Sequence, residues 1–326
     1  MDVSVIVCTH DRSASLARVL AGLAAQTGLE DRSWEIVVVD NQSTDGTAAV
    51  VRAAAASCPV PLRYRYESVP GKSNALNAGI DAAAGRILAF TDDDVELTPG
   101  WLAGLVEVME RFRCDGVGGP VVPVWTGPSP RWLAEAGPYR MHAAVVDFQH
   151  GDEPIALDAA PLGANSAYRR EVFERYGRFR ADLGHVGRAP LPCEDTELAR
   201  RVLRGGGELR YAPGAVVYHD VEPARLNRRY FLDWYKARGR AAAREESSDG
   251  NAATIAGVPR HLLRTFVTSL VRWVFSVGSI RRFFHKLQTW RTAGAIAEAR
   301  RTTPPAGTAP TSAGTHRRSP RSTPAP

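Results

Sequence analysis

Three consecutive carboxylates, Asp92, Asp93 and Asp94, follow directly after the apolar run Arg86–Thr91. Like charges gathered at the end of one strand repel each other unless a cation neutralises them. Open α/β sheets bind their ligands at the carboxyl ends of their strands, and carboxylate oxygens suit Mg²⁺ or Mn²⁺. Because a solvated turn before a helix also uses acidic residues, the triplet by itself leaves both interpretations open.

Two further polar groups stand where a ligand could reach them. Asp40 ends the apolar run Val37–Val39, where a carboxylate can accept a hydrogen bond from a nucleobase or a ribose hydroxyl. Lys72 opens a helix after Gly71, and its charge, together with the free amides of that helix start, suits an anionic group. A capped helix with a solvated lysine explains the second pattern equally well.

A second acidic pair, Glu194-Asp195, opens another helix. Acidic residues at that position cap the helix, which stabilises it by roughly 0.5–2 kcal/mol. A carboxylate in the same position can also act as a general base toward an acceptor hydroxyl. The pair therefore allows a structural and a catalytic interpretation.

Alternating strands and helices are predicted for the first 112 residues. Strands are predicted at Val3–Cys8 and Glu35–Val39, which are buried apolar runs, at Leu62–Glu67, where apolar and polar residues alternate, and at the apolar run Arg86–Thr91. The helices have apolar residues at helical spacing, at Ser13–Gln26, Thr44–Ala56, Ser73–Ala83 and Pro99–Phe112. Repeated units of this length predict an α/β fold with a mostly parallel, doubly wound sheet and helices on both faces.

The second half of the chain is less regular. It predicts an irregular lobe at 125–160, a helix at Glu194–Leu203, a strand pair near Glu208–Ala212 and Ala215–Tyr218, and a helix at Arg225–Arg244. A linker at 247–258, basic amphipathic helices at 259–300 and a disordered, Pro- and Thr-rich tail at 301–326 follow.

Several classes of protein are disfavoured. The first strand ends in Cys8-Thr9-His10-Asp11-Arg12, without the glycines that a dinucleotide site or a P-loop needs. The four cysteines are scattered and contain no CxxC pair, so neither a zinc site nor a disulfide framework is predicted. Asp2 stands where a signal peptide has basic residues, and we expect a cytoplasmic protein.

Several motifs, in one order along residues 3–240, resemble family 2 glycosyltransferases of the GT-A fold. They begin with the strand ends already described, in the stretches VIVCTHDR, VVVDNQSTDGT, GKSNALNAG and FTDDDVELTPGWL. They continue with PLGANSAYRR at 161–170, CEDTELARR at 193–201 and YAPGAVVYH at 211–219. The resemblance implies a catalytic domain at 1–246, with a nucleotide-sugar part at about 1–124 and an acceptor part at about 125–246.

The resemblance also implies a role for each matching residue. Asp195 is the general base, and Glu194 is its neighbour and the main rival for that role. Asp94 ligates a divalent metal, Mn²⁺ or Mg²⁺, and Asp92 faces the ribose or the metal. His219 completes the metal or diphosphate shell, or is simply a surface histidine. The remaining donor-site residues implied by the resemblance are Thr9, Asp40, Lys72, Asp93 and Asn165, with Asp93 supporting the loop and Asn165 on either the donor or the acceptor loop.

The implied reaction is transfer of a sugar from a nucleoside-diphosphate-sugar to a hydroxyl acceptor by single displacement, with inversion at the anomeric carbon. The acceptor could be a lipid-linked glycan, as in cell-surface polysaccharide or glycolipid synthesis. A nucleotide-sugar-binding protein without turnover and a nucleotidyltransferase remain alternatives. The first requires a defective base or metal site, whereas Asp92, Asp94 and Asp195 are all present. The second should show an Arg/Lys- and Gly-rich loop after the first strand, which CTHDRSASL does not resemble.

Charge is distributed unevenly along the chain. Residues 1–249 have 29 Lys and Arg against 34 Asp and Glu, whereas residues 250–326 have 12 against one. In the basic part, Leu263, Phe266, Val267, Leu270, Val271 and Val274 would form one helical face, and Arg260, Arg264, Thr268, Arg272 and Ser276 the other. Arginines interrupt the apolar run too often for a transmembrane span.

This pattern favours an interfacial helix on an anionic membrane, at the inner face of the cell membrane. Packing of the same helix on the catalytic domain, with its basic face solvated, is the alternative. No nucleic-acid partner is expected, because no nucleic-acid-binding module accompanies the charge.

Overall fold

The computed structural model describes residues 1–125, 127–134, 136–141, 144–185, 193–246 and 254–302. Its centre is a seven-stranded sheet of order β3-β2-β1-β4-β8-β6-β9. These strands are β1 (Val3–Thr9), β2 (Trp34–Asp40), β3 (Leu62–Tyr66), β4 (Ile87–Thr91), β6 (Gly116–Gly118), β8 (Asn165–Arg169) and β9 (Leu209–Tyr211). Only β8 is antiparallel to its neighbours, β4 and β6. The predicted mostly parallel α/β sheet is confirmed.

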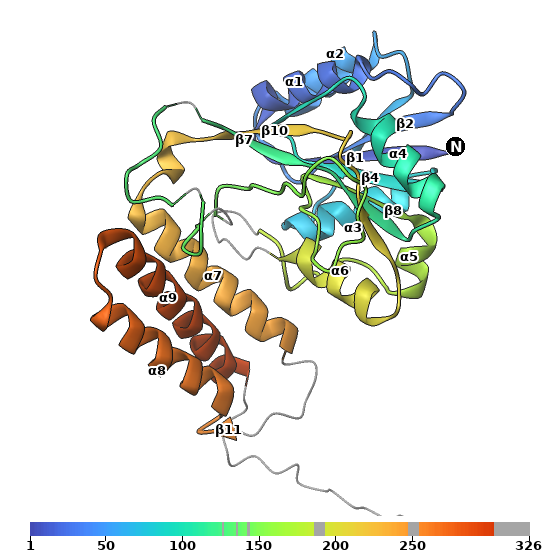
Figure 1. Ribbon diagram of the computed structural model, residues 1–326. Coiled ribbons are helices and arrows are strands. Elements are labelled where there is room, and N and C mark those ends of the chain that lie inside the picture. Colours follow the sequence, from blue (N-terminus) through green and yellow to red (C-terminus); the bar gives the residue numbers. More distant parts are fainter. Residues whose placement is uncertain (126, 135, 142–143, 186–192, 247–253, 303–326) are drawn as a thin grey trace, which may run out of the picture.

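Helices cover both faces of this sheet, with α1 and α2 on one side and α3 on the other (Figure 1). The helices of this part are α1 (Ser13–Ala24), α2 (Thr47–Ala55), α3 (Lys72–Ala82), α4 (Trp101–Phe112), α5 (Arg170–Arg175) and α6 (Glu194–Arg204). Because β2 lies between two covered faces, all seven of its residues are buried, which explains its run of valines. The main hydrophobic core extends from β1 through β4 to β9.

A second, three-stranded sheet has the order β5-β10-β7 and consists of β5 (Val95–Leu97), β10 (Val217–Val221) and β7 (Val121–Trp125). The prediction of a strand pair near 208–218 was wrong in its pairing, because β9 joins the large sheet and β10 joins the small one. The chain turns between them, where the Ala215 amide donates to the Ala212 carbonyl and the Val217 amide donates to the Pro120 carbonyl. This turn redirects β10 onto β5 and β7.

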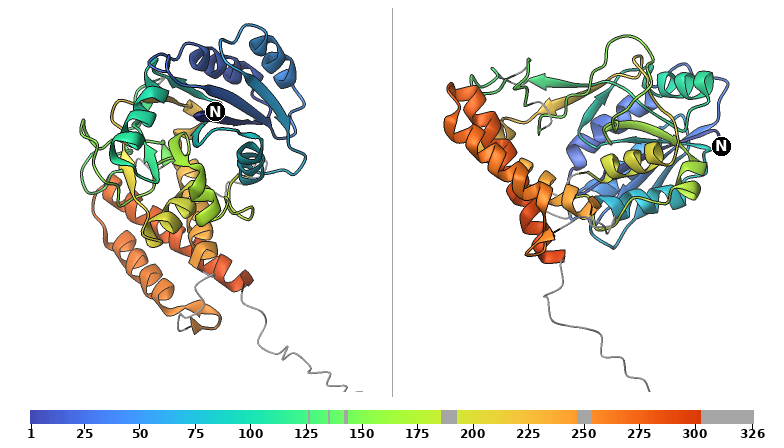
Figure 2. Two further views of the ribbon diagram at one scale, coloured as in Figure 1. Left: turned by 90° about the vertical axis from the view of Figure 1, so that its right-hand side faces the viewer. Right: turned by 60° about the horizontal axis from the view of Figure 1, so that its bottom comes forward.

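Three long helices form a separate layer beside the sheet domain (Figure 2). They are α7 (Arg228–Glu246), α8 (Arg260–Phe275) and α9 (Ser279–Thr302), and the short helix η2 (Pro223–Arg225) precedes α7. None of the helices in the described residues has the length and apolar character needed to span a bilayer.

The connections around these helices differ in part from the prediction. Residues 254–258 of the predicted linker, together with Pro259, form a small hairpin of β11 (Thr254–Ile255) and β12 (Val258–Pro259). Its other residues, 247–253, lie outside the described residues. The same holds for residues 303–326 of the predicted disordered tail, whereas residues 301–302 belong to α9.

Helix α9 packs closely on α7. A second hydrophobic core joins them and includes Phe231 and Tyr235 of α7 with Phe283 and Leu287 of α9. Glu298, the one acidic residue after position 249, is buried and accepts hydrogen bonds from Arg240 at 2.9 Å and Arg244 at 2.6 Å. Because a buried carboxylate needs such partners, this contact fixes α9 on α7.

Two glycines allow the backbones of α7 and α9 to approach each other. A Cβ atom at Gly239 would lie 1.8 Å from the Arg291 carbonyl oxygen, and one at Gly294 would lie 2.0 Å from the Lys236 carbonyl oxygen. Neither carbonyl can move without disturbing its own helix. Glycine is therefore required at this crossing, whatever its helix propensity.

We predict that Gly239→Ala lowers the free energy of unfolding by about 1–3 kcal/mol, because the added methyl group forces the helices apart. Thermal unfolding with urea titration measures the change. Gly22→Ala is the matched control, since a Cβ at this helical glycine would meet only the Leu97 Cβ at 3.9 Å. The control should be neutral or stabilising by up to about 1 kcal/mol. Equal unfolding free energies for both variants would contradict the close crossing.

Candidate active site

The carboxyl ends of β1, β2 and β4 bring the predicted donor-site residues together. Thr9 at the end of β1 lies directly beside Asp40 at the end of β2, and Val7 lies beside Thr91. Asp92 therefore follows β4 at the same edge of the sheet. Parallel pairing explains this convergence, because equivalent ends of parallel strands meet at one edge.

His219 reaches the acidic triplet through the small sheet. Antiparallel pairing of β10 with β5 places His219 opposite Val95, the residue after Asp94. Its Nε2 atom lies 3.5 Å from Asp94 Oδ1, and its side chain is buried. His219 is therefore a buried neighbour of Asp94 and not a surface histidine.

Lys72, the first residue of α3, lies between the two acidic segments. Its Nζ atom is 2.7 Å from Asp92 Oδ1 and 3.6 Å from Glu194 Oε1. Burial opposes ionisation of Asp92, but the Lys72 ammonium holds the pKa of that carboxyl below its ordinary value. Burial raises the pKa of Glu194, against the opposing effect of Lys72. Lys72 thus links the Asp triplet to the start of α6.

Two arginines also neutralise the triplet, and sequence reasoning missed both. The Arg12 guanidinium donates to Asp94 and, at 3.1 Å, to Asp93, while Arg225 Nη2 lies 3.8 Å from Asp94 Oδ2. Burial raises the pKa of Asp93 to about 6 despite the nearby Arg12 charge. Arg12 lies three residues after the end of β1, so a search of the residues that follow each strand could have found it. Arg225 has no comparable local signal.

The two carboxylates at the start of α6 lie in different surroundings. Glu194 is buried and faces Lys72, whereas Asp195 is half-buried. Asp195 Oδ2 accepts the Gly163 amide at 2.8 Å, and Oδ1 accepts the Thr196 amide at 2.6 Å. The preceding Cys193 has a φ of 103°, in a region that residues other than glycine rarely adopt. Such strain persists only where the surrounding structure holds the backbone.

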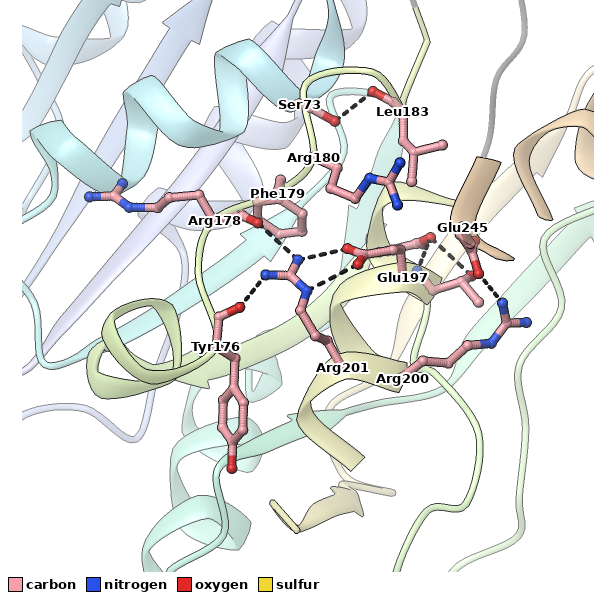
Figure 3. Close-up of polar contacts among 12 residues, drawn as sticks. Ser73, Tyr176, Arg178, Phe179, Arg180, Leu183, Glu197, Arg200, Arg201 and Glu245 are labelled. Atoms are coloured by element: carbon pink, nitrogen blue, oxygen red, sulfur yellow. Dashed lines mark hydrogen bonds and ion pairs between the residues drawn. The ribbon is translucent and has the colours of Figure 1, made fainter. Parts of the chain in front are cut away.

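Ion pairs along α6 supply part of this support (Figure 3). Arg201 pairs with Glu197 at 2.6 Å and donates to the carbonyl oxygens of Tyr176 and Arg178. Arg200 pairs with Glu245 at the end of α7. The helix that presents Asp195 is therefore attached both to the 176–183 loop and to the helical layer.

Asp40 is buried, and both of its oxygens already have partners. Oδ1 accepts the Ser43 amide at 2.8 Å, and Oδ2 accepts the Tyr64 hydroxyl at 2.7 Å. Because Tyr64 itself is exposed, its hydroxyl can exchange with a ligand group. Thr9 is buried beside Asp40.

The structure corrects the predicted role of Asn165. Its side chain is fully buried, and its amide donates to the carbonyl oxygens of Pro120 at 2.9 Å and Ala215 at 2.7 Å. Its Oδ1 atom accepts the indole N–H of Trp101 at 2.8 Å. Asn165 therefore joins β8 to the turn before β10 and is not available to contact a donor or acceptor.

The donor set around Asp94 fits a divalent ion that shares its ligand shell with a substrate. In the part of the chain that the structure describes, no three His, Cys, Asp or Glu side chains form a complete metal cluster. Mg²⁺ is usually held by one or two carboxylates together with substrate phosphates, not by an all-protein cage. Asp94 with His219 3.5 Å away, near Asp92, meets that lower requirement once Arg12 releases Asp94.

Comparison with known proteins gives one family match and several relatives. The family model described as "Glycosyl transferase family 2" matches residues 4–177. The succinoglycan biosynthesis protein ExoM of Rhizobium meliloti is 28% identical over 239 residues, which cover 73% of this chain and 72% of that protein. A glucosyl-dolichyl phosphate glucuronosyltransferase of Haloferax volcanii is 26% identical over 242 residues, covering 72% of each chain.

A solved structure supports the fold. The mannosyltransferase PcManGT from Pyrobaculum calidifontis, in complex with GDP-Man and Mn²⁺, superposes with a TM-score of 0.56 at 22% sequence identity. The superposition covers 94% of this chain and 76% of that one. The GT-A-like fold implied by the sequence motifs is confirmed.

We predict that Asn165→Ala lowers the free energy of unfolding by about 3 kcal/mol or more, because buried partners at Trp101, Pro120 and Ala215 each lose a hydrogen bond. Thermal and urea unfolding test this. Asn74→Ala, which removes an exposed bond to the Pro70 carbonyl, should change stability by less than about 1 kcal/mol. A fully stable Asn165 variant with weakened donor binding would instead return this residue to the binding site.

Proposed function

Since the chain belongs to glycosyltransferase family 2, we propose that it transfers a sugar from a nucleoside-diphosphate-sugar to an acceptor hydroxyl, inverting the anomeric centre. The observation that carries this proposal is the convergence of the Asp92–Asp94 triplet, His219 and the Glu194-Asp195 pair around Lys72. A binding protein without turnover would not need a half-buried carboxylate held beside this cluster. A nucleotidyltransferase would need a basic, glycine-rich loop, which β1 lacks.

The donor occupies the edge formed by β1, β2 and β4 in this proposal. Thr9 and Asp40 bind the nucleoside, and Asp40 exchanges its Tyr64 hydrogen bond for one to the base or the ribose. Lys72 and Asp92 bind next to the diphosphate, while Asp93 keeps Arg12 in place. The cations already in the cluster suit the charge of the donor.

Asp94 and His219, with Asp92, hold a divalent metal, Mn²⁺ or Mg²⁺. A metal held there would supply positive charge at the leaving diphosphate. In this arrangement Arg12 keeps its hydrogen bond to Asp93 and gives up its hydrogen bond to Asp94. Lys72 and Arg225 lie near enough to contribute further positive charge at the leaving group.

Asp195 acts as the general base. It accepts the acceptor hydroxyl proton while that oxygen forms a bond to the anomeric carbon and the bond to the diphosphate oxygen breaks. The Gly163 and Thr196 amides donate to its oxygens and fix its orientation. Glu194 is less suited, because it is buried against Lys72. Attack opposite to the leaving group gives inversion.

We place this reaction in cell-surface polysaccharide or glycolipid synthesis, with a hydroxyl of a lipid-linked glycan as acceptor. The named relatives act in succinoglycan biosynthesis and on a glucosyl-dolichyl phosphate. The chain would act at the cytoplasmic side of the membrane, as a peripheral protein. The basic, partly apolar α8 supports this location.

Donor and metal specificity can be tested by thermal shift with UDP-, dTDP- and GDP-sugars, each with Mn²⁺, Mg²⁺ or a chelator. One nucleotide-sugar with metal should raise the melting temperature by about 5 °C or more at saturation, because ligand binding stabilises the folded state by about 2.7 kcal/mol at 100 times Kd. The chelator should remove most of the shift. His219→Ala should also reduce the metal-dependent part. Absence of any shift with every nucleotide and both metals would refute the donor site.

The base assignment predicts that Asp195→Asn lowers kcat by about 10²–10⁴-fold, since proton acceptance is lost. Its thermal shift with donor and metal should remain near that of the wild type. Glu194→Gln is the matched control and should retain more activity, because Glu194 lies beside Lys72 and not toward the acceptor. If Asp195→Asn retains full activity and Glu194→Gln loses it, Glu194 is the base.

A further inference from the structure

Helix α8 buries very little of itself. Ser269 is the buried residue of this 16-residue helix. Of its apolar face, Leu263, Phe266 and Leu270 are half-buried, whereas Val267, Val271 and Val274 are about half or more exposed. The three valines have the spacing of one helical stripe. One edge of the apolar face is therefore packed, and the other remains uncovered.

The exposed stripe continues into the turn between α8 and α9. Phe275 at the end of α8 is 78% exposed, and Val277 in the turn is 87% exposed. Soluble proteins seldom expose a continuous apolar patch unless it contacts a partner or a membrane. We call Val267, Val271, Val274, Phe275 and Val277 the apolar edge.

Six cations surround the apolar edge. They are Arg260, Arg264, Arg272, Arg281, Arg282 and Lys286. None of them makes an ion pair among the described residues, although ion pairs are frequent elsewhere in the same part of the chain. The sequence has no Asp or Glu between residues 250 and 297. Among the described residues the charge of this surface is therefore uncompensated, and it is complementary to an anionic partner.

A cavity of about 700 Å³ lies between the start of α7 and the α8–α9 turn. Its lining includes three cations, Arg228, Arg282 and Lys286. Aromatic rings hold two of them, since the Arg228 guanidinium lies 5.2 Å from the Phe283 ring and Lys286 Nζ lies 5.4 Å from the Trp273 ring. Stacking on a ring positions a cation without neutralising its charge. The cavity is thus prepared for a group with negative charge, such as a phosphate.

We propose that α8, the following turn and the first turns of α9 dock on an anionic phospholipid bilayer, and that this cavity binds a headgroup phosphate. The apolar edge enters the interfacial region, and Arg264, Arg272 and Arg281 contact neighbouring headgroups. An anionic bilayer fits better than an acidic protein, because the exposed apolar stripe, the flanking arginines and Trp273 are the features of interfacial helices. This inference rests on the peripheral membrane attachment that is part of the proposed function. It does not depend on the proposed sugar transfer.

The docking surface lies close to the candidate active site along the chain. Arg228 in the cavity follows Arg225 by three residues, a separation of at most about 11 Å. Arg225 Nη2 in turn lies 3.8 Å from Asp94 Oδ2. A bilayer held at this surface therefore places a lipid-linked acceptor near the donor site.

Cosedimentation of the full-length protein with vesicles tests the proposal without donor, metal or acceptor. Wild-type protein should bind equimolar phosphatidylcholine–phosphatidylglycerol vesicles and should bind phosphatidylcholine vesicles at least about tenfold more weakly. Val271→Ser with Val274→Ser and Phe275→Ser should lower partitioning about tenfold or more. Val69→Ser with Ile155→Ser, at exposed apolar positions of the catalytic domain, is the control and should bind as the wild type does.

The cavity is tested separately with Arg282→Gln and Lys286→Gln together. Each basic residue at an anionic surface contributes about 1 kcal/mol, so this pair should lower partitioning about 30-fold. Arg300→Gln with Arg301→Gln removes the same charge from the far end of α9 and should lower it less than about threefold. All variants keep Arg317, Arg318 and Arg321, so any contribution from these residues is constant.

Several outcomes would overturn the proposal. Equal binding of both vesicle types would contradict the headgroup site. Equal effects of the Arg282–Lys286 and Arg300–Arg301 double variants would contradict it as well. Thermal stabilisation by inorganic phosphate without vesicle binding would make the cavity a site for a soluble phosphate. Loss of a dimer in the apolar-edge variant, without vesicle binding by the wild type, would make this surface an interface between two copies. Asp195→Asn should bind vesicles normally, so failure of the proposed catalysis remains distinguishable.

Discussion

Carboxylates from two distant segments, Asp92–Asp94 and Glu194-Asp195, converge near one edge of the central sheet, and Lys72 and Arg12 make that convergence possible. Several of these side chains are buried or half-buried, where repulsion between like charges is weakly screened. Lys72 joins the segments by pairing with Asp92 and Glu194, while Arg12 pairs with Asp93 and Asp94. Without these cations the carboxylates would have to take up protons or move apart.

This charge balance explains how one cluster can serve both folding and ligand binding. Lys72, Arg12 and Arg225 partly neutralise the carboxylates of the free protein, so an arriving anionic donor and its metal exchange partners with groups that are already in place. Arg12 can retain Asp93 when Asp94 changes partner. Asp195 makes no ion pair with these cations among the described residues, and its oxygens accept the Gly163 and Thr196 amides.

The C-terminal helices show a similar division between structure and surface. Helix α9 is fixed to α7 by the Gly239–Gly294 crossing and by buried Glu298. Helix α8 packs mainly on α9 and leaves outside an apolar edge and several cations that make no ion pair among the described residues. A rigid pair of helices thus supports a third helix whose outer surface is incomplete in the isolated protein. Arg200 with Glu245 connects this layer to α6, the helix of the candidate base.

The sequence by itself determined the elements and the local chemistry. Buried valine runs fixed β1 and β2, helical periodicity fixed α1 to α4, and the strand-end rule selected Asp40, Asp92 and Asp94. These signals are local, since each depends on residues within about one element. Because these signals are local, the sequence showed the basic and apolar character of α8 but not that α8 packs on α9.

Tertiary structure decided which distant groups meet. Pairing of β5 with β10 brought His219 to Asp94, and the turn after β9 sent β10 into a second sheet. In the fold, Asn165 is buried and has a scaffold role in place of the predicted ligand contact. The fold also brings Arg12 and Arg225 to the acidic triplet. The sequence shows which side chains can form ion pairs or hydrogen bonds. Only the fold shows which of them are desolvated together, because burial and distance set the strength of those interactions.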